Sequence, residues 1–198
     1  MRNQWLALPL TSGLAATLLT GCGSESGGSA ADSDSVVVGM SDDVLATDPA
    51  SGYDPGSWLL FNNVFQSLLS FPNGATQPEP EAARKCRFTD RQTKVFTCTL
   101  RDGLKFSNGN DLTSKDVKYS FDRVREINDK TGPAIMFPML DEVETPDAKT
   151  VVFKLKFPDA TFPSKIASGA GSIVGVAHGT GSPSVRCESR LRRTASSV

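Results

Sequence analysis

The sequence is poor in histidine, tryptophan and tyrosine, with one, two and two copies among 198 residues. The single histidine, His178, lies near the C-terminus, so neither a Ser-His-Asp triad nor a zinc site in the preceding region has a histidine to use. No glycine-rich phosphate loop opens a predicted helix. Paired acids such as Asp141-Glu142 are common on surfaces, and acids alone leave a carboxylate hydrolase or glycosidase as a minor alternative. The sequence therefore favours a protein that is not an enzyme, with no cofactor and no metal.

The chain also has no excess of charge of one sign, with 21 lysines and arginines against 22 aspartates and glutamates. This balance disfavours nucleic acid as a partner. Residues 175–198 differ from the rest, because they carry four arginines and one glutamate, a net charge of +3, and no apolar repeat. We interpret residues 175–198 as an unrelated basic tail, either a frameshifted reading or a disordered end. A contact with RNA or anionic lipid is the remaining alternative.

No apolar run reaches the roughly 20 residues that a transmembrane helix requires. The longest one lies within residues 1–21, follows Arg2, and is interrupted by Pro9 and Gly13. A short charged start, an apolar middle and small residues at the end are typical of a secretory signal. We therefore expect residues 1–21 to be a signal peptide, with a transmembrane helix as the weaker alternative.

The sequence Leu-Thr-Gly-Cys at residues 19–22 resembles the lipobox of bacterial lipoproteins. This resemblance implies that the signal is removed before Cys22 and that the Cys22 thiol carries the lipid, which anchors the chain to the outer face of the cell membrane. With Cys22, the Gly- and Ser-rich residues 23–35 form segment 22–35, a lipidated cysteine and flexible tether. Thirteen flexible residues have a root-mean-square reach of about 20 Å.

The remaining cysteines are Cys86, Cys98 and, in the basic tail, Cys187. The sequence KCRFTDRQTKVFTCTL predicts a β-hairpin with a polar turn over residues 90–94. If Cys86 lies opposite Cys98, the same register places Phe88 opposite Phe96 on the same face. Opposed positions of a hairpin suit a disulfide, and an oxidising compartment would preserve it. The competing interpretation, a metal site, has neither the cysteine spacing nor a nearby histidine to support it.

Other segments alternate between strand and helix patterns. Residues 36–40 predict a buried strand and residues 59–69 a helix. Thr113 predicts a helix N-cap, with Asp116 in the position of a capping-box acid, and Val117, Phe121, Val124 and Ile127 form the apolar stripe. Residues 149–157 alternate Val151, Phe153, Leu155 and Phe157 with mostly polar residues, as in an antiparallel strand with one solvated face. Together these patterns predict a mixed α/β (α+β) class.

Several stretches, read in order, resemble a known family: VVVGMSDDVLATDPASG, LLFNNVFQSLLSF, FTCTLRDGLKFSNGNDLTSKDVKYSFDRV and VETPDAKTVVFKLKFPDATFPSKIASGAGSIV. They are similar to family 5 solute-binding proteins of ABC transporters, the extracytoplasmic receptors for oligopeptides, dipeptides and, in some members, nickel. The resemblance covers residues 36–174 and is absent beyond them. Where the family usually places aromatic residues on the hairpin, this chain has Cys86 and Cys98.

The resemblance implies that residues 36–174 are a partial solute-binding domain. The expected fold is an incomplete type II periplasmic-binding-protein-like fold, mainly its small N-terminal sheet domain. Family members are more than twice as long, with two lobes that close on the ligand, so this chain as written should bind weakly.

The resemblance also implies a peptide ligand, ABC permease subunits as partners and an extracellular or periplasmic location. The loop after the first strand borders the family's cleft, which makes Tyr53 and Trp58 candidate ligand contacts. They could equally cover the sheet, and Asp42, Asp43, Asp48 and Asp54 could neutralise a peptide amino group or shape a turn. A lipoprotein sensor or adhesin without a transport role is the alternative function.

Overall fold

The computed structural model describes residues 39–176. Predictions for the signal peptide, for Cys22 and its tether, and for nearly all of the basic tail lie outside these residues. The described residues 40–176 form one compact unit, which contains the entire described core. Its elements are, in chain order, α1 (Pro55–Val64), β1 (Leu69–Ser70), β2 (Glu79–Pro80), β3 (Ala83–Phe88), β4 (Val95–Leu100), α2 (Ser114–Ile127), η1 (Pro133–Met136), β5 (Leu140–Glu144), β6 (Thr150–Leu155), α3 (Phe162–Ile166) and η2 (Gly169–Gly171).

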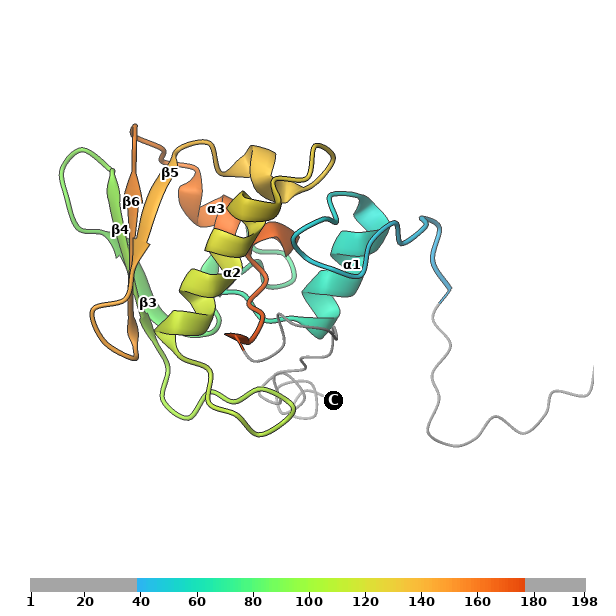
Figure 1. The fold of residues 1–198 in the computed structure, drawn as a ribbon, viewed down its shortest axis with the longest axis horizontal. Coiled ribbons are helices and arrows are strands. Elements are labelled where there is room, and N and C mark those ends of the chain that lie inside the picture. Colours follow the sequence, from blue (N-terminus) through green and yellow to red (C-terminus); the bar gives the residue numbers. More distant parts are fainter. Residues whose placement is uncertain (1–38, 177–198) are drawn as a thin grey trace, which may run out of the picture. The chain divides into compact units, whose positions relative to one another are not determined.

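An antiparallel sheet of four strands, in the order β3-β4-β6-β5, organises this unit. Figure 1 views the sheet nearly edge-on, with α2 and α3 on the same side of it. Two further strands, β1 and β2, pair with each other in a separate small ribbon. The described region is thus a mixed α/β fold, as the sequence predicted.

The β3–β4 hairpin has the register that the sequence predicted. Cys86 lies opposite Cys98, and Phe88 lies opposite Phe96. Between Ala83 and Lys85 the register shifts, so that Arg84 is the extra residue of a bulge. Bulges of this kind bend an edge strand and increase its twist.

Helix α2 begins where its capping signals predicted. Thr113 is the N-cap, and its backbone amide donates to a carboxylate oxygen of Asp116 at 2.8 Å, as in a capping box. The helix ends at Asn128, whose left-handed backbone (φ 42°) is a common helix stop. Val117, Phe121 and Val124 are buried, so the predicted apolar stripe faces the core.

Aromatic side chains fill the space between the sheet and its helices. Phe153 of β6 lies at the centre, with its ring centroid 5.0 Å from that of Phe121 and 5.2 Å from that of Phe162. Both pairs are edge-to-face, the arrangement that aromatic quadrupoles favour. Phe96 and Phe137 extend the cluster.

Helix α1 begins earlier and ends earlier than the predicted 59–69. Asp54 accepts the amide of Ser57 at 2.8 Å as the N-cap, and Pro55 occupies the first helical position. Proline is favoured at this position because its missing amide would have no helical partner. The helix stops at Phe65, which has extended backbone; Gln66 forms an isolated bridge with Ile173, and only Leu69 of the predicted last turn lies in β1.

Three terminal positions of the predicted apolar patterns are exposed. Met40, at the described end of the strand predicted over residues 36–40, is outside any strand. Ile127 is 42% exposed in the last turn of α2, and Phe157 is 49% exposed beyond the end of β6. A periodicity does not reveal which of its end positions the rest of the fold covers.

The chain leaves the fold along α2. The hydroxyl of Ser120 accepts the amide of Val174 at 2.9 Å, and Asp116 accepts the amide of Val176 at 3.0 Å. Gly175 is buried, so the packed region continues past residue 174. Among the described residues, none of the helices is both long enough and apolar enough to span a membrane.

Candidate functional site

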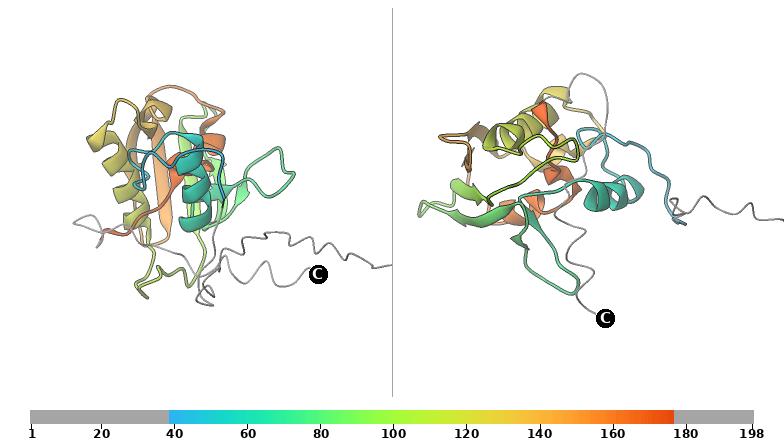
Figure 2. Two further views of the ribbon diagram at one scale, coloured as in Figure 1. Left: turned by 90° about the vertical axis from the view of Figure 1, so that its right-hand side faces the viewer. Right: turned by 90° about the horizontal axis from the view of Figure 1, so that it is seen from below.

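The candidate ligand contacts Tyr53 and Trp58 lie close together at the start of α1. Their ring centroids are 5.3 Å apart, with the planes nearly perpendicular. Asp54, the N-cap, and Pro55, the first helical residue, lie between them in sequence, so the start of the helix determines the position of Tyr53 relative to Trp58. Figure 2 shows this loop and α1 from two further directions.

The two aromatic side chains differ in how much surface they offer. The indole nitrogen of Trp58 donates to the carbonyl oxygen of Gly52 at 3.3 Å. Its ring packs on Gly169, where an added Cβ would lie 2.9 Å from the indole. The Trp58 side chain thus mainly makes contacts within the fold, whereas the Tyr53 side chain is 45% exposed and is the one of the two that a ligand can reach.

Two of the four aspartates in the preceding loop have partners that are not adjacent in sequence. Asp54 caps α1, and hydrogen bonding to Ser57 lowers the pKa of its carboxyl group below the ordinary value. Asp48 binds the guanidinium of Arg123 through both carboxylate oxygens, and one of these oxygens also accepts the amide of Ala50 at 2.9 Å. Asp42 and Asp43 are exposed, and Asp42 accepts the hydroxyl of its neighbour Ser41 at 3.1 Å. The acids that remain available to a ligand amino group are therefore Asp42 and Asp43.

Arg123 is the residue that sequence reasoning missed. It lies on α2, 75 positions from Asp48, and its bidentate pair ties the loop before α1 to the helix that covers the sheet. The hydrogen bond with Arg123 is the main reason that the pKa of Asp48 falls below its ordinary value. No local pattern signals a contact over this separation, because the helical stripe of α2 identifies only its buried face.

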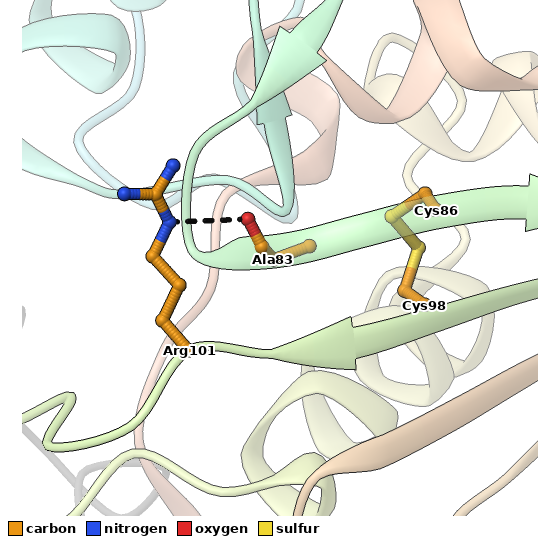
Figure 3. Close-up of a disulfide and its surroundings, with 4 residues drawn as sticks. All are labelled: Ala83, Cys86, Cys98 and Arg101. Atoms are coloured by element: carbon orange, nitrogen blue, oxygen red, sulfur yellow. Dashed lines mark hydrogen bonds between the residues drawn. A yellow bond between two sulfur atoms is a disulfide. The ribbon is translucent and has the colours of Figure 1, made fainter.

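The hairpin cysteines are joined in the structure, with a sulfur–sulfur distance of 2.01 Å (Figure 3). Cys98 is fully buried, and Cys86 lies on the edge strand β3. Near the other end of the strand, the Nε of Arg101 donates to the carbonyl oxygen of Ala83 at 3.2 Å, and another guanidinium nitrogen donates to Pro80 at 3.0 Å. Edge strand β3 thus has two attachments beyond the backbone ladder: the disulfide to β4 within the strand, and the hydrogen bond from Arg101, which follows β4, at its first residue.

The structure brings the candidate contacts of the loop together but separates them from the cysteine pair, which lies on another element. The predicted lipid attachment at Cys22 lies outside the described residues. Within residues 39–176, no group of three or more histidine, cysteine or acidic side chains is placed to hold a metal ion.

Comparison with known proteins identifies one family. The family model for bacterial extracellular solute-binding proteins, family 5 (Middle), matches residues 77–185. A curated protein of Escherichia coli (strain K12), described as "Probable D,D-dipeptide-binding periplasmic protein DdpA", is 34% identical over 145 residues, which are 71% of this chain and 28% of that protein.

Solved structures share the fold. The clavulanic acid biosynthesis oligopeptide binding protein 2 is 28% identical with a TM-score of 0.63, over 70% of this chain and 29% of that one. The ABC transporter-associated periplasmic binding protein DppA from Helicobacter pylori, in complex with the peptide STSA, is 26% identical with a TM-score of 0.58, over 67% and 29%. This chain therefore spans less than a third of the length of each of these three proteins.

Proposed function

Since this chain belongs to the bacterial extracellular solute-binding proteins of family 5, we propose that it is part of a receptor that binds peptides outside the cell membrane and delivers them to an ABC permease. The supporting observation is the family match together with peptide-binding relatives in each comparison: a dipeptide-binding protein, an oligopeptide-binding protein and a complex with STSA. Membership in a solute-binding family also makes the chain a binding protein rather than an enzyme, which removes the hydrolase alternative.

The proposed location is the outer face of the cell membrane, with Cys22 as the lipid attachment site. The family is extracellular, in agreement with a signal peptide over residues 1–21. Membrane fractionation tests the anchor. We expect the protein in the membrane fraction and a Cys22→Ser variant, which has no lipid-bearing thiol, in the soluble fraction. An unchanged distribution would contradict the lipid anchor.

We further propose that the described residues are the small sheet domain of a type II periplasmic-binding-protein-like fold, together with the start of the lobe that carries it. On this proposal, Tyr53 contacts the peptide and Trp58 supports it. The relatives contain more than twice as much additional chain, which would supply the opposing wall of the cleft. A ligand held against one wall keeps most of its surface in water, so this chain alone should bind peptides more weakly than micromolar.

A chimera provides the test. Residues 36–174 would replace the corresponding segment of the H. pylori protein DppA, and calorimetry would measure binding of STSA. We expect the chimera to bind the peptide, and Tyr53→Ala to weaken this binding about tenfold, as loss of an aromatic contact typically does. Leu59→Ala is the matched control, because Leu59 is similarly exposed on α1. A chimera that folds, as shown by circular dichroism, but does not bind STSA would refute the proposal.

A further inference from the structure

The β3–β4 hairpin carries a concentrated net positive charge. Residues 84–101, here called the basic hairpin, contain six cationic side chains and one acidic side chain, Asp90, for a net charge of +5. The whole chain has a net charge of −1, so the remainder carries −6. The cationic residues are Arg84, Lys85, Arg87, Arg91, Lys94 and Arg101.

Cations of the basic hairpin point to the face of the sheet that carries no helix. Lys85 pairs with Thr99 and Arg87 with Thr97, in alternation with the cysteines and phenylalanines of the inner face. The hydroxyl groups of Thr89 and Thr97 are 3.3 Å apart on this outer face. Cationic and hydroxyl groups therefore lie side by side there, a combination suited to phosphate oxygens.

Three of these charges are not neutralised by salt bridges among the described residues. Lys85, Arg87 and Arg91 are exposed, and none of them forms a salt bridge with the described residues. The carboxylate of Asp90 accepts the amides of Lys94 and Val95 at 3.0 Å, so it closes the turn of the hairpin. The hairpin therefore presents a positive field to solvent.

The opposite edge of the sheet has the opposite sign. Strand β5 carries Asp141, Glu142 and Glu144, and Lys154 of β6 pairs with Glu142 at 3.4 Å and with Glu144. Charged side chains on an edge strand discourage pairing with another chain, and either sign serves that purpose. The concentration of one sign on β3 and its turn therefore calls for a separate explanation.

We propose that the outer face of the basic hairpin is a docking surface for the anionic headgroups of a phospholipid bilayer. The proposal rests on the proposed function for proximity, because a lipid on Cys22 and a tether of about 20 Å would hold the domain at the membrane. Lipid is favoured over nucleic acid because the chain belongs to an extracellular family. A cation at an anionic membrane contributes about 1 kcal/mol, or about fivefold in partitioning.

The fragment Met40–Val198 allows a direct test, because it contains the whole described core and lacks Cys22. The fragment is sedimented with vesicles of phosphatidylglycerol mixed with phosphatidylcholine, and with vesicles of phosphatidylcholine alone. We expect binding to the anionic vesicles only, weakening as salt is added. Replacing Lys85, Arg87 and Arg91 by glutamine should weaken binding to the anionic vesicles on the order of 100-fold, because each cation strengthens partitioning to the membrane about fivefold.

The matched control removes the same charge from the basic tail, as R190Q/R192Q/R193Q. We expect a smaller loss from this variant than from K85Q/R87Q/R91Q. Circular dichroism verifies that both variants fold. Four results would each overturn the proposal. They are a loss of vesicle binding in the tail variant that equals or exceeds the loss in the hairpin variant, equal binding to neutral and anionic vesicles, no binding to either kind of vesicle, and tighter binding to polyglutamate than to anionic vesicles. None of these results affects peptide binding by the chimera, so the two proposals fail separately.

Discussion

The ion pair between Asp48 and Arg123 should measurably hold the loop that carries Tyr53. The test is a double-mutant cycle with Asp48→Asn and Arg123→Met. Asparagine keeps an oxygen that can accept the Ala50 amide, and methionine keeps an unbranched apolar stem, so the cycle isolates the charge interaction. The distance from the Arg123 Nη1 to the Asp48 Oδ1 is 2.6 Å, and the second guanidinium nitrogen contacts the other carboxylate oxygen.

The burial of the pair sets the expected magnitude. The side chains are 24% exposed for Arg123 and 39% exposed for Asp48. Exposed pairs contribute about 0.2–1 kcal/mol, whereas breaking a fully buried pair costs about 3–5 kcal/mol. Because solvent still reaches both groups but the contact is bidentate, we expect a coupling free energy of about 1–1.5 kcal/mol, just above the exposed range and well below the buried one. Urea unfolding monitored by circular dichroism measures it.

The pH dependence gives a second measurement of the same pair. The pKa of Asp48 is lower in the folded protein than its ordinary value of 3.8, mainly because of the hydrogen bond with Arg123. The stabilisation is therefore complete above the ordinary pKa and is lost as the pH falls through the folded value. We expect the coupling to be constant near neutral pH and to disappear in acid below 3.8.

Lys105 and Asp111 provide the control pair, with a nitrogen–oxygen distance of 2.6 Å but side chains that are 53% and 73% exposed. Their coupling, from Lys105→Met and Asp111→Asn, should be less than about 0.5 kcal/mol. Hydrogen exchange of the amides in residues 42–54 should increase in the Asp48 and Arg123 variants and not in the control variants. If the two pairs had equal coupling, the reasoning from burial would be refuted.

Two further predictions concern the sheet. Replacing Cys86 and Cys98 by serine should lower the free energy of unfolding by about 3 kcal/mol, as expected for a short closed loop. Reduction of the native protein should raise its intact mass by two hydrogens, and an unchanged mass would disprove the bridge. Phe153→Ala should lower the free energy of unfolding by about 3–5 kcal/mol, because the Phe153 ring is fully buried among other phenylalanines. Phe157→Ala, at the exposed end of the same alternation, should lower it by less than about 1 kcal/mol. Urea unfolding distinguishes the two phenylalanine variants, and equal costs would show that Phe157 belongs to the core.

Local signals predicted much of the fold. The hairpin register followed from requiring Cys86 to face Cys98, because strand alternation then determines every other pair. The start of α2 followed from Thr113 and Asp116, since a capping box involves residues three positions apart. Both predictions depend on residues no more than twelve positions apart, and the structure confirms both.

Contacts between distant segments were not predictable in the same way. The ion pair of Asp48 with Arg123 joins the loop before α1 to α2, and the sequence pattern of neither segment predicts contact with the other. The Asp54 and Pro55 signals for the start of α1 were present in the sequence, but the apolar residues after them drew the prediction towards 59–69. Trp58 was predicted as a contact by residue type, and only its hydrogen bond to Gly52 shows how far the fold uses it.

The position of β6 determines when the sheet can be completed as the chain emerges from the ribosome. A polypeptide that emerges N-terminus first delivers β3, β4 and β5 before β6, yet β6 is the neighbour of both β4 and β5. Until residue 155 has emerged, the earlier strands have no common partner, and their free backbone groups remain available for wrong associations. Completion of the sheet must therefore follow the arrival of β6, and a pause before β6 leaves one edge of β4 and one edge of β5 unpaired.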